Sequence, residues 1–483
     1  MALQEFLRRA KTEVGISTLA HASRDVHILL LTRGIRMFAY GSSTLVLALY
    51  FAELGFSDTQ IGLFMTLTLI GDVGLSLLLT LVADSLGRRK ILVVGGILMA
   101  VSGVVFAIAT NYWLLLLVAV VGVISPSGNE IGPFKAIEES TLAHLSDAKT
   151  RSDIFAFHVV FGTLGGAGGF LAGGWITQTL QTAGWSEAAS FRFIFWIYAA
   201  AGLTKAALTG LLSSKCETRP VPAERPSGQA QSEETESFLS NTEQAATPPK
   251  KRSAISSISP KSQKTLFKLC SLFFFDSLAS GMCPNSLIAF FLSRKFNLPE
   301  GQLGSIIASA QFVSSIGNLF ASAIAKRIGF VKTMVFTHLP SAIFLSLMPL
   351  PTSLWSTITL LVARASLNAM DQAPRSAFLS AIVLPDERTA VMGIVNTVKT
   401  MSQSSGPFLT GSLAESGRFW IAFVFAGALK AAYDVGLLTL FLHTKLEGDS
   451  SRRVSDDARL QDDEHELANA RERNSGDDSD ERH

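Results

Sequence analysis

The chain has 483 residues, of which 48% are hydrophobic and only 17% are charged, with a net charge of +2. A mean hydropathy of +0.35 excludes an ordinary soluble enzyme and indicates a protein that crosses a membrane several times. The three cysteines, Cys216, Cys270 and Cys283, have neither metal-ligand spacing nor the pattern of a disulfide framework, so we expect no metal and no cofactor.

The first part of the chain, residues 1–26, is polar and basic, and no apolar core precedes a small-residue cleavage site. We expect a cytoplasmic N-terminal segment without a cleaved signal peptide. Apolar runs then follow, and the main runs approach the ~20 residues that a membrane-spanning helix needs. The first run, at about 27–51, carries Arg33, Arg36 and Tyr40 at a spacing that places them on one face of a helix.

A short charged loop separates the second and third apolar runs. Its Gly87 permits a tight reversal of the backbone, and Arg88 and Arg89 hold the loop on the cytoplasmic side because cations cross a membrane at high cost. Asp84 would lie in the last turn of the second span, where an anion is unfavourable unless cations face it. We therefore expect this loop to act as a cytoplasmic latch.

The fourth run changes character after Ile124, where prolines and glycines interrupt it and Glu130 and Glu138 follow. Proline and glycine at membrane depth are tolerated where protein or water satisfies the freed backbone groups. We therefore expect this half of the fourth span to face a cavity.

The apolar pattern stops at residues 214–263, where Ser, Glu, Pro, Thr and Lys dominate. With too little apolar surface to form a core, this segment is predicted to be a disordered cytoplasmic linker. Further apolar runs follow within residues 264–443, and the acidic residues 444–483 are predicted to be a disordered cytoplasmic tail. The two apolar parts, 27–213 and 264–443, are each predicted to be a six-helix bundle.

The two halves of the chain repeat one another, which indicates two bundles with the same order of helices. Gly62 and Gly87 recur at the same separation as Gly304 and Gly329. Further matches are Gly169 with Gly406, Gly174 with Gly411, Glu138 with Arg375, Gly202 with Gly427, and Lys205 with Lys430.

The loop residues Asp84, Gly87, Arg88 and Arg89 resemble the signature between the second and third helices of the major facilitator superfamily. With the repeat, the resemblance covers about residues 27–443. It implies an all-α membrane protein with twelve transmembrane helices in two pseudo-symmetric six-helix bundles. It also implies a secondary transporter rather than an enzyme.

In that family the first helix of each three-helix unit lines the central cavity, which assigns spans 1, 4, 7 and 10 to it. The ionisable residues agree, because a charge inside a membrane costs about 2.5–3.5 kcal/mol even on lenient insertion scales and is functional by default. The predicted substrate and coupling residues are Arg33, Arg36, Tyr40, Asp72, Glu130, Asp276, Asn368 and Asp371. The predicted cytoplasmic gate consists of Asp84, Gly87, Arg88, Arg89, Glu138 and Arg375.

Two interpretations stay open for Glu138, Glu139, Asp371 and Arg375, which lie near the inner ends of their spans. They contact substrate, or they form an ion-pair network that locks the cytoplasmic side. Lys205 and Lys430 belong to peripheral spans, where we expect them to extend toward the membrane surface.

Proton coupling needs a carboxylate that changes its protonation inside the membrane. Asp72 and Asp276 are the carboxylates nearest the middle of their spans. We expect Arg33 and Arg36 to hold one of them ionised until substrate or a proton displaces the pair.

Span 5 contains Gly165, Gly169, Gly173 and Gly174, a pattern that resembles the antiporter signature of drug-exporting facilitators, with Phe170 in place of its proline. The resemblance implies export. The alternative is close helix packing, which needs small residues at four-residue spacing and has no bearing on direction.

Residues and resemblance together predict proton-coupled export of small organic compounds by alternating access, of the multidrug or toxin efflux type. No G-x-x-x-x-G-K-[ST] loop is present, so the energy must come from an ion gradient or from the substrate's own gradient. The alternatives are a uniporter or symporter that takes up a polar solute, and a transporter-like receptor that senses a ligand.

Cations are more frequent in the loops after even-numbered spans, which predicts that both termini lie in the cytoplasm. We expect a multi-pass protein of the plasma membrane, with an internal membrane as the alternative. Its expected partners are a small-molecule substrate, protons and the lipid bilayer, without nucleic acid, and its expected working form is a monomer.

Overall fold

The structure, a computed structural model, describes residues 16–122, 124, 133–147, 150–217, 260–383 and 387–441. Within these ranges all regular structure is helical. The N-terminal half contains α2 (Ile16–His21), α3 (Arg24–Glu53), α4 (Asp58–Leu86), α5 (Arg88–Ile108), α6 (Tyr112–Val121), α7 (Pro133–Leu145), α8 (Arg151–Thr182), α9 (Glu187–Gly210) and the 3₁₀ helix η1 (Ser214–Cys216). The C-terminal half contains α10 (Pro260–Met282), α11 (Asn285–Phe296), α12 (Glu300–Ile328), α13 (Phe330–Leu347), α14 (Leu354–Asn368), α15 (Gln372–Ile382), α16 (Arg388–Glu415) and α17 (Phe419–Phe441).

Three of the predicted spans are built from two consecutive helices, namely α6 with α7, α10 with α11, and α14 with α15. Pro284 precedes α11 in an extended conformation, and Pro374 lies in the first turn of α15. Proline has no N–H to donate to the preceding turn, so it is well tolerated at a helix start. Most of the predicted linker 214–263 and nearly all of the predicted tail 444–483 lie outside the described residues, so the domain boundaries stay a prediction.

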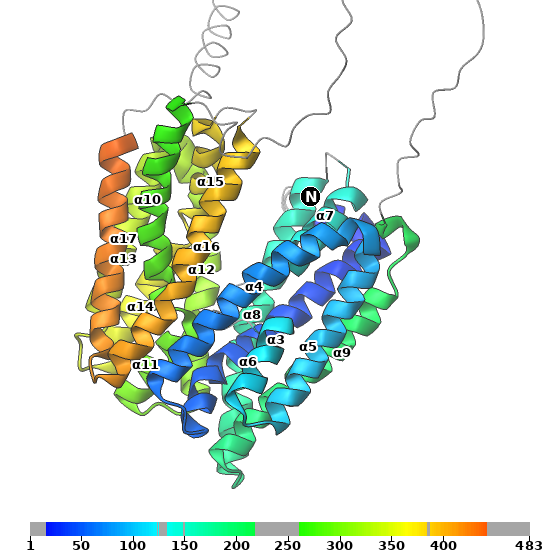
Figure 1. Cartoon of the computed structure of the whole chain (residues 1–483), viewed down its shortest axis with the longest axis vertical. Coiled ribbons are helices and arrows are strands. Elements are labelled where there is room, and N and C mark those ends of the chain that lie inside the picture. Colours follow the sequence, from blue (N-terminus) through cyan, green and yellow to red (C-terminus); the bar gives the residue numbers. More distant parts are fainter. Residues whose placement is uncertain are drawn as a thin grey trace, which may run out of the picture.

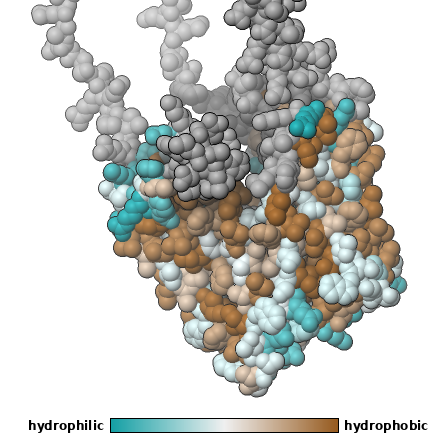
Figure 2. Space-filling view, turned by 180° about the vertical axis from the view of Figure 1, so that it is seen from behind, coloured by the Kyte–Doolittle hydropathy of each residue, from teal (hydrophilic) through white to brown (hydrophobic). Residues whose placement is uncertain are grey.

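Seven helices in the described part of the chain are long and apolar enough to cross a membrane: α3, α5, α8, α9, α10, α13 and α17. Many large apolar side chains on them face outward, for example Leu203 on α9 and Phe336 on α13, which are 60% and 63% exposed. Figure 2 shows apolar side chains over much of the face that it presents, with polar side chains gathered toward the ends. Such a surface fits a hydrocarbon environment, where exposed apolar groups carry no penalty.

The helices form two bundles that lie side by side, α2–α9 in one and α10–α17 in the other (Figure 1). Two long helix pairs join the bundles, α4 with α16 and α8 with α12. In each pair the beginning of one helix meets the end of the other. We call this region, at the bottom of Figure 1, the joined end.

Glycines allow the backbones to touch at the joined end. A Cβ atom on Gly174 of α8 would overlap the carbonyl oxygen of Glu300 on α12 and lie 3.0 Å from the Cα of Gly304. A Cβ atom on Gly411 of α16 would overlap a carbonyl oxygen of α4 and lie 3.1 Å from the Cα of Gly62. The two crossings are therefore equivalent, because the repeat matches Gly174 with Gly411 and Gly304 with Gly62.

Polar contacts reinforce the joined end. Arg294 on α11 binds the carboxylate of Asp58 at 2.5 Å, and Glu415 accepts hydrogen bonds from the amide of Thr59 at 3.0 Å and the hydroxyl of Ser57 at 3.1 Å. The hydrogen bonds from Thr59 and Ser57 lower the pKa of Glu415, so this contact is present at neutral pH and is lost as the pH falls.

The remaining span-5 glycines pack α8 against α3. Cβ atoms on Gly165 and Gly169 would overlap carbonyl oxygens of α3, and one on Gly173 would lie 2.9 Å from the Cα of Ser42. Four-residue spacing places these glycines on one helix face, and small residues let two helices approach closely. The packing alternative for this motif thus has a direct structural basis.

The glycine crossings predict how the joined end can be opened. Gly411→Val should disfavour the contact of α16 with α4 by about 1–3 kcal/mol, since overpacking against backbone has that typical effect. The readout is the reaction rate of Ser286→Cys, in a chain without the native cysteines, with a thiol reagent, because Ser286 on α11 is buried against Met65 of the other bundle.

Gly393→Val is the matched control, because Gly393 lies on the same helix, α16, and has open space around its Cβ position. The cysteine should react faster in the Gly411 variant and at the unaltered rate in the Gly393 variant. Equal rates in the two variants would contradict the assigned role of the crossing.

Candidate functional site

A buried carboxylate, Glu138 of α7, organises the centre of the N-terminal bundle. Arg36 of α3 donates to its Oε2 atom at 2.6 Å, and both side chains are at most 1% exposed. Lys205 of α9 places its Nζ atom 3.6 Å from the other carboxylate oxygen, and the Nε2 atom of His158 on α8 lies 3.7 Å from Oε2. Four helices therefore contribute to one charge cluster, which we call the N cluster.

The other predicted residues of span 1 lie beside the N cluster. The Nη1 atom of Arg33 is 3.3 Å from Nε2 of His158, and Arg33 fits against α8 where Gly162 has no side chain. The ring of Tyr40 stacks on that of Tyr198 with a centroid separation of 6.3 Å. Arg33, Arg36 and Tyr40 are all buried, as expected for one face of α3 that points into the bundle.

The equivalent place in the C-terminal bundle holds Asp276 of α10. Arg375 of α15 donates to its Oδ2 atom at 2.7 Å, and Lys430 of α17 donates to its Oδ1 atom at 2.8 Å. Arg375 also binds Asp371, one turn earlier, and the Nε2 atom of His338 on α13 lies 3.6 Å from Asp276. We call this group, with Asp434 bound to His338, the C cluster.

The two clusters have the same arrangement of charged residues, but the acid and the arginine exchange places between the two spans. In the N cluster the base, Arg36, is on span 1 and the acid, Glu138, is on span 4. In the C cluster the acid, Asp276, is on span 7 and the base, Arg375, is on span 10. In both bundles a lysine from the sixth span contacts the acid. The repeat had matched Glu138 with Arg375, and the structure places each of them in an ion pair of its own bundle.

One sequence-based expectation is wrong and another is narrowed. Lys205 and Lys430 do not extend to the membrane surface, since they are 1% and 3% exposed and contact buried carboxylates. Asp276 is held by Arg375 and Lys430 of its own bundle and not by Arg33 or Arg36, so the expected role of these two arginines stays a prediction for Asp72. The sequence places charges along each helix, but helix packing selects the partners.

The loop residues contact the end of their own bundle. The carboxylate of Glu217 accepts hydrogen bonds from the backbone amides of Arg88 at 2.9 Å and Arg89 at 3.3 Å. An anion at the start of α5 is favourable because the N-terminal amides and the helix dipole attract it. Gly87 precedes that helix with a φ of 88°, which only glycine adopts readily.

Several predicted residues lack described partners. Asp72 of α4 is 6% exposed, and its Oδ1 atom has no hydrogen-bond partner in the described part of the structure. Asn368 is the last residue of α14 and is half-buried. Glu130 and the side chain of Asp84 lie outside the described residues, so their predicted roles stay predictions.

Sequence reasoning missed His338 and Asp434, whose side chains are 2% and 0% exposed. A signal was present, because each is an ionisable residue inside a long apolar run. Among the described residues, no group of three or more His, Cys, Asp and Glu side chains is arranged to hold a metal ion.

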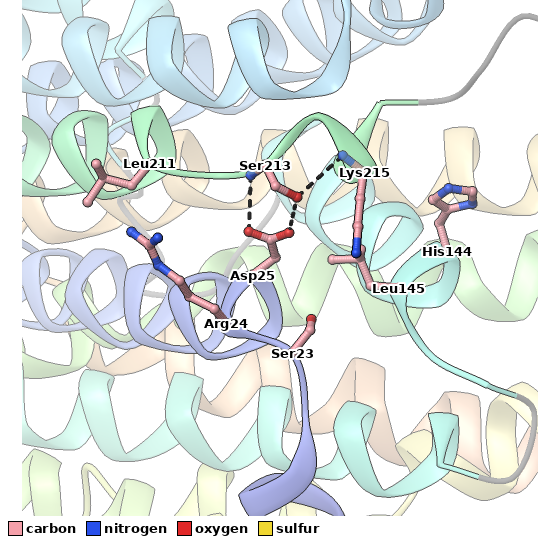
Figure 3. Close-up of a pocket in the computed structure, with 8 residues that line it drawn as sticks. All are labelled: Ser23, Arg24, Asp25, His144, Leu145, Leu211, Ser213 and Lys215. Atoms are coloured by element: carbon pink, nitrogen blue, oxygen red, sulfur yellow. Dashed lines mark hydrogen bonds between the residues drawn. The ribbon is translucent and has the colours of Figure 1, made fainter.

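A separate cavity of about 530 Å³ lies where α3 begins, away from the joined end (Figure 3). In it the carboxylate of Asp25 accepts hydrogen bonds from the amide of Ser213, at 3.0 Å, and from the hydroxyl of the same residue. Its lining residues are Ser23, Arg24, Asp25, His144, Leu145, Leu211, Ser213 and Lys215, none of which is a predicted site residue.

Comparison with known proteins agrees with this geometry. A family model described as Major Facilitator Superfamily matches residues 29–275 and 269–460. A protein of Saccharomyces cerevisiae, described as "Uncharacterized membrane protein YJR124C", is 35% identical over 429 residues, which cover 87% of this chain and 95% of that protein.

Two solved structures share the fold. The nucleoside transporter NupG has a TM-score of 0.63 at 16% identity, covering 87% of this chain and 100% of its own. An inward-facing bacterial homologue of the human lysosomal transporter Spinster has a TM-score of 0.58 at 16% identity, covering 86% and 96%.

The N cluster makes a prediction about stability. Glu138→Gln should lower the free energy of unfolding by about 3–5 kcal/mol, since it leaves Arg36 and Lys205 as buried cations without their carboxylate. Thermal unfolding of the purified protein in detergent measures the effect.

Glu139→Gln on the neighbouring position is the control. Glu139 pairs with Lys135 at 3.9 Å, and both side chains are at least 36% exposed, so its loss should change the stability by about 0–1 kcal/mol. Adding Lys205→Met to the Glu138 variant should restore part of the stability. Equal effects of the Glu138 and Glu139 variants would contradict the assigned pairing.

Proposed function

This chain belongs to the major facilitator superfamily, and from that premise we propose that it exports small organic compounds in exchange for protons. As a member of this family it is a membrane transporter, not an enzyme, with twelve transmembrane helices in two six-helix bundles. The proposal concerns what this transporter carries, in which direction, and what drives it.

The observation that carries the proposal is the pair of buried ion clusters with opposite polarity. In each cluster the acid and the arginine lie on the first and fourth spans of the bundle, and a lysine of the sixth span contacts the acid. Charges inside a membrane are costly and are retained where they bind ions, substrates or each other. A substrate with a polar or charged group can exchange partners with Arg36 or Asp276, and this would change the balance of charge inside each bundle.

Alternating access requires two states with different open ends. The glycine crossings and the Arg294–Asp58 ion pair hold the bundles together at the joined end. If the termini are cytoplasmic, as loop charges predict, the joined end faces away from the cytoplasm and this arrangement corresponds to an inward-facing state. We propose a plasma-membrane protein that works in this way as a monomer.

Three buried carboxylates support proton coupling. Asp276 and Glu138 are held by cations, so a proton competes with those cations for the carboxylate. Asp72 is buried on α4 and has an oxygen atom without a hydrogen-bond partner among the described residues. Burying a carboxyl oxygen without a hydrogen bond is costly, so Asp72 is a second candidate for the coupling residue.

The direction of transport rests on the span-5 resemblance alone, since the structure gives those glycines a packing role. Cells that overproduce the protein separate the alternatives when they are grown on a panel of toxins and nutrients. Resistance to a toxin supports export. Sensitivity supports uptake of a polar solute, the competing proposal.

Coupling is tested in liposomes that contain the purified protein. Asp276→Asn should abolish accumulation of the substrate driven by a pH gradient while exchange of substrate across the membrane stays measurable, because Asn resembles Asp in shape but has neither the negative charge nor the proton affinity of the carboxylate. If that variant still accumulates substrate, Asp72→Asn is expected to show the same separation.

Glu139→Gln, which changes a half-exposed acid, is the control and should behave as the unaltered protein. Accumulation against the gradient in both Asn variants, with an unaltered pH dependence, would overturn proton coupling through these residues. Binding of substrate without counterflow in the unaltered protein would indicate a receptor instead.

A further inference from the structure

A buried histidine–aspartate pair joins α13 and α17 of the C-terminal bundle. The Nδ1 atom of His338 on α13 lies 2.9 and 3.0 Å from the two carboxylate oxygens of Asp434 on α17. Both side chains are at most 2% exposed. We call them the His–Asp pair.

The N-terminal bundle shows what the fold itself requires at these positions. Counted from the matched loop glycines Gly87 and Gly329, His338 corresponds to Gly96. Counted from the matched lysines Lys205 and Lys430, Asp434 corresponds to Thr209.

The residues of the N-terminal bundle serve packing alone. Gly96 allows α5 to approach α9, since a Cβ there would lie 2.7 Å from the backbone nitrogen of Ala206. The hydroxyl of Thr209 donates to the carbonyl oxygen of Lys205 on its own helix at 2.8 Å. The equivalent helices α5 and α9 therefore pack without a charged side chain at these two positions, and the His–Asp pair is an addition that packing does not require.

The partners of His338 assign its tautomer. Nδ1 faces a carboxylate and therefore carries the proton that is donated to Asp434. Nε2 lies 3.4 Å from Nζ of Lys430, which also donates to Asp276 and to Ser280, both at 2.8 Å. An ammonium group has three N–H donors, so neutral Nε2 serves as the third acceptor.

A second proton on His338 would change these contacts. It would bond to Nε2, remove the acceptor for Lys430, and place an imidazolium beside an ammonium group. The new N–H would then compete with Lys430 for Oδ1 of Asp276, which is 3.6 Å away. Asp276 in turn binds Arg375, so the change would reach the charge pair of spans 7 and 10.

The groups that face His338 come from several helices. From α17 these are Asp434 and Lys430, together with the ring of Tyr433, which packs edge-on at a centroid distance of 5.8 Å. From α10 it is Asp276, which Arg375 of α15 binds from its other side. The helix α14 packs against the same part of α13, where the backbone carbonyl of Arg364 accepts a hydrogen bond from Ser341, nearly one turn beyond His338.

We propose that the His–Asp pair is the proton-carrying site of this transporter, linked through Lys430 and Asp276 to the ion pair of spans 7 and 10. A proton from one compartment binds Nε2 of His338 and leaves from the same atom to the other compartment, so no other covalent bond changes. Asp434 stabilises the imidazolium, and Lys430 and Asp276 transmit the change in charge to Arg375. This inference rests on proton coupling as proposed above.

The test measures proton and substrate fluxes together in liposomes. His338→Gln and Asp434→Asn should each lower accumulation driven by a pH gradient by about tenfold or more, within the range typical of coupling between two sites. Substrate exchange without a gradient should stay near the unaltered rate, and its pH dependence should become flat.

Two further variants keep the test independent of folding. The double variant His338→Gly, Asp434→Thr carries the residues of the N-terminal bundle, so the helix pair should still pack, and it should show the same loss of coupling. Tyr433→Phe is the matched control, because it keeps the ring beside His338 and removes a hydroxyl that has no hydrogen-bond partner among the described residues. It should behave as the unaltered protein.

Each outcome decides the inference. A normal ratio of protons to substrate in the His338 variants would overturn it and leave the proposed function standing. Loss of exchange together with coupling would also overturn it, because it indicates a structural role. Substrate transport without any proton flux in the unaltered protein would overturn the proposed function, and this inference with it.

Discussion

A charge inside a membrane needs a partner, and this requirement shapes both bundles of the protein. Glu138 and Asp276 are each surrounded by an arginine and a lysine from other helices, with a histidine nearby. Such ion pairs contribute little net stability, because desolvation offsets the attraction. Removing one partner of such an ion pair is nevertheless costly, because the other charge stays buried without its partner. A change in the charge of one residue therefore also disturbs how the helices of that bundle pack.

The repeat explains why the clusters correspond, and the differences between the copies suggest a division of work. The two copies share helix order, loop glycines and the lysine of the sixth span, all of which serve packing or pairing. They differ in which helix carries the acid, and in the His–Asp pair, which has no charged counterpart at Gly96 and Thr209. Features that one copy lacks are not needed for the fold, and they point to the steps in which the bundles act differently.

The joined end and the main ion pairs of the clusters lie on different helices of each bundle. The crossings fix α4 against α16 and α8 against α12, while the ion pairs connect α3 with α7 and α10 with α15. Rigid bundles that touch through backbone contacts at glycines can separate at one end without repacking their cores. A change of charge within one bundle can therefore shift which end of the transporter is closed.

The sequence alone determined the class of the protein. Runs of apolar residues fix how many helices cross the membrane, a repeat of glycines and lysines fixes the two-fold plan, and the loop around Gly87 points to the family. It also marked most of the ionisable residues that the clusters contain, because a charge within an apolar run is visible without coordinates.

Only the tertiary structure decided which charges meet. Arg36 could bind any acid at its depth, and Lys205 could reach the surface, since periodicity places a residue on a helix face but not opposite a particular neighbour. The packing of four helices around Glu138 and of their counterparts around Asp276 made that choice, because a buried charge must be paired by whichever opposite charge lies within about 4 Å.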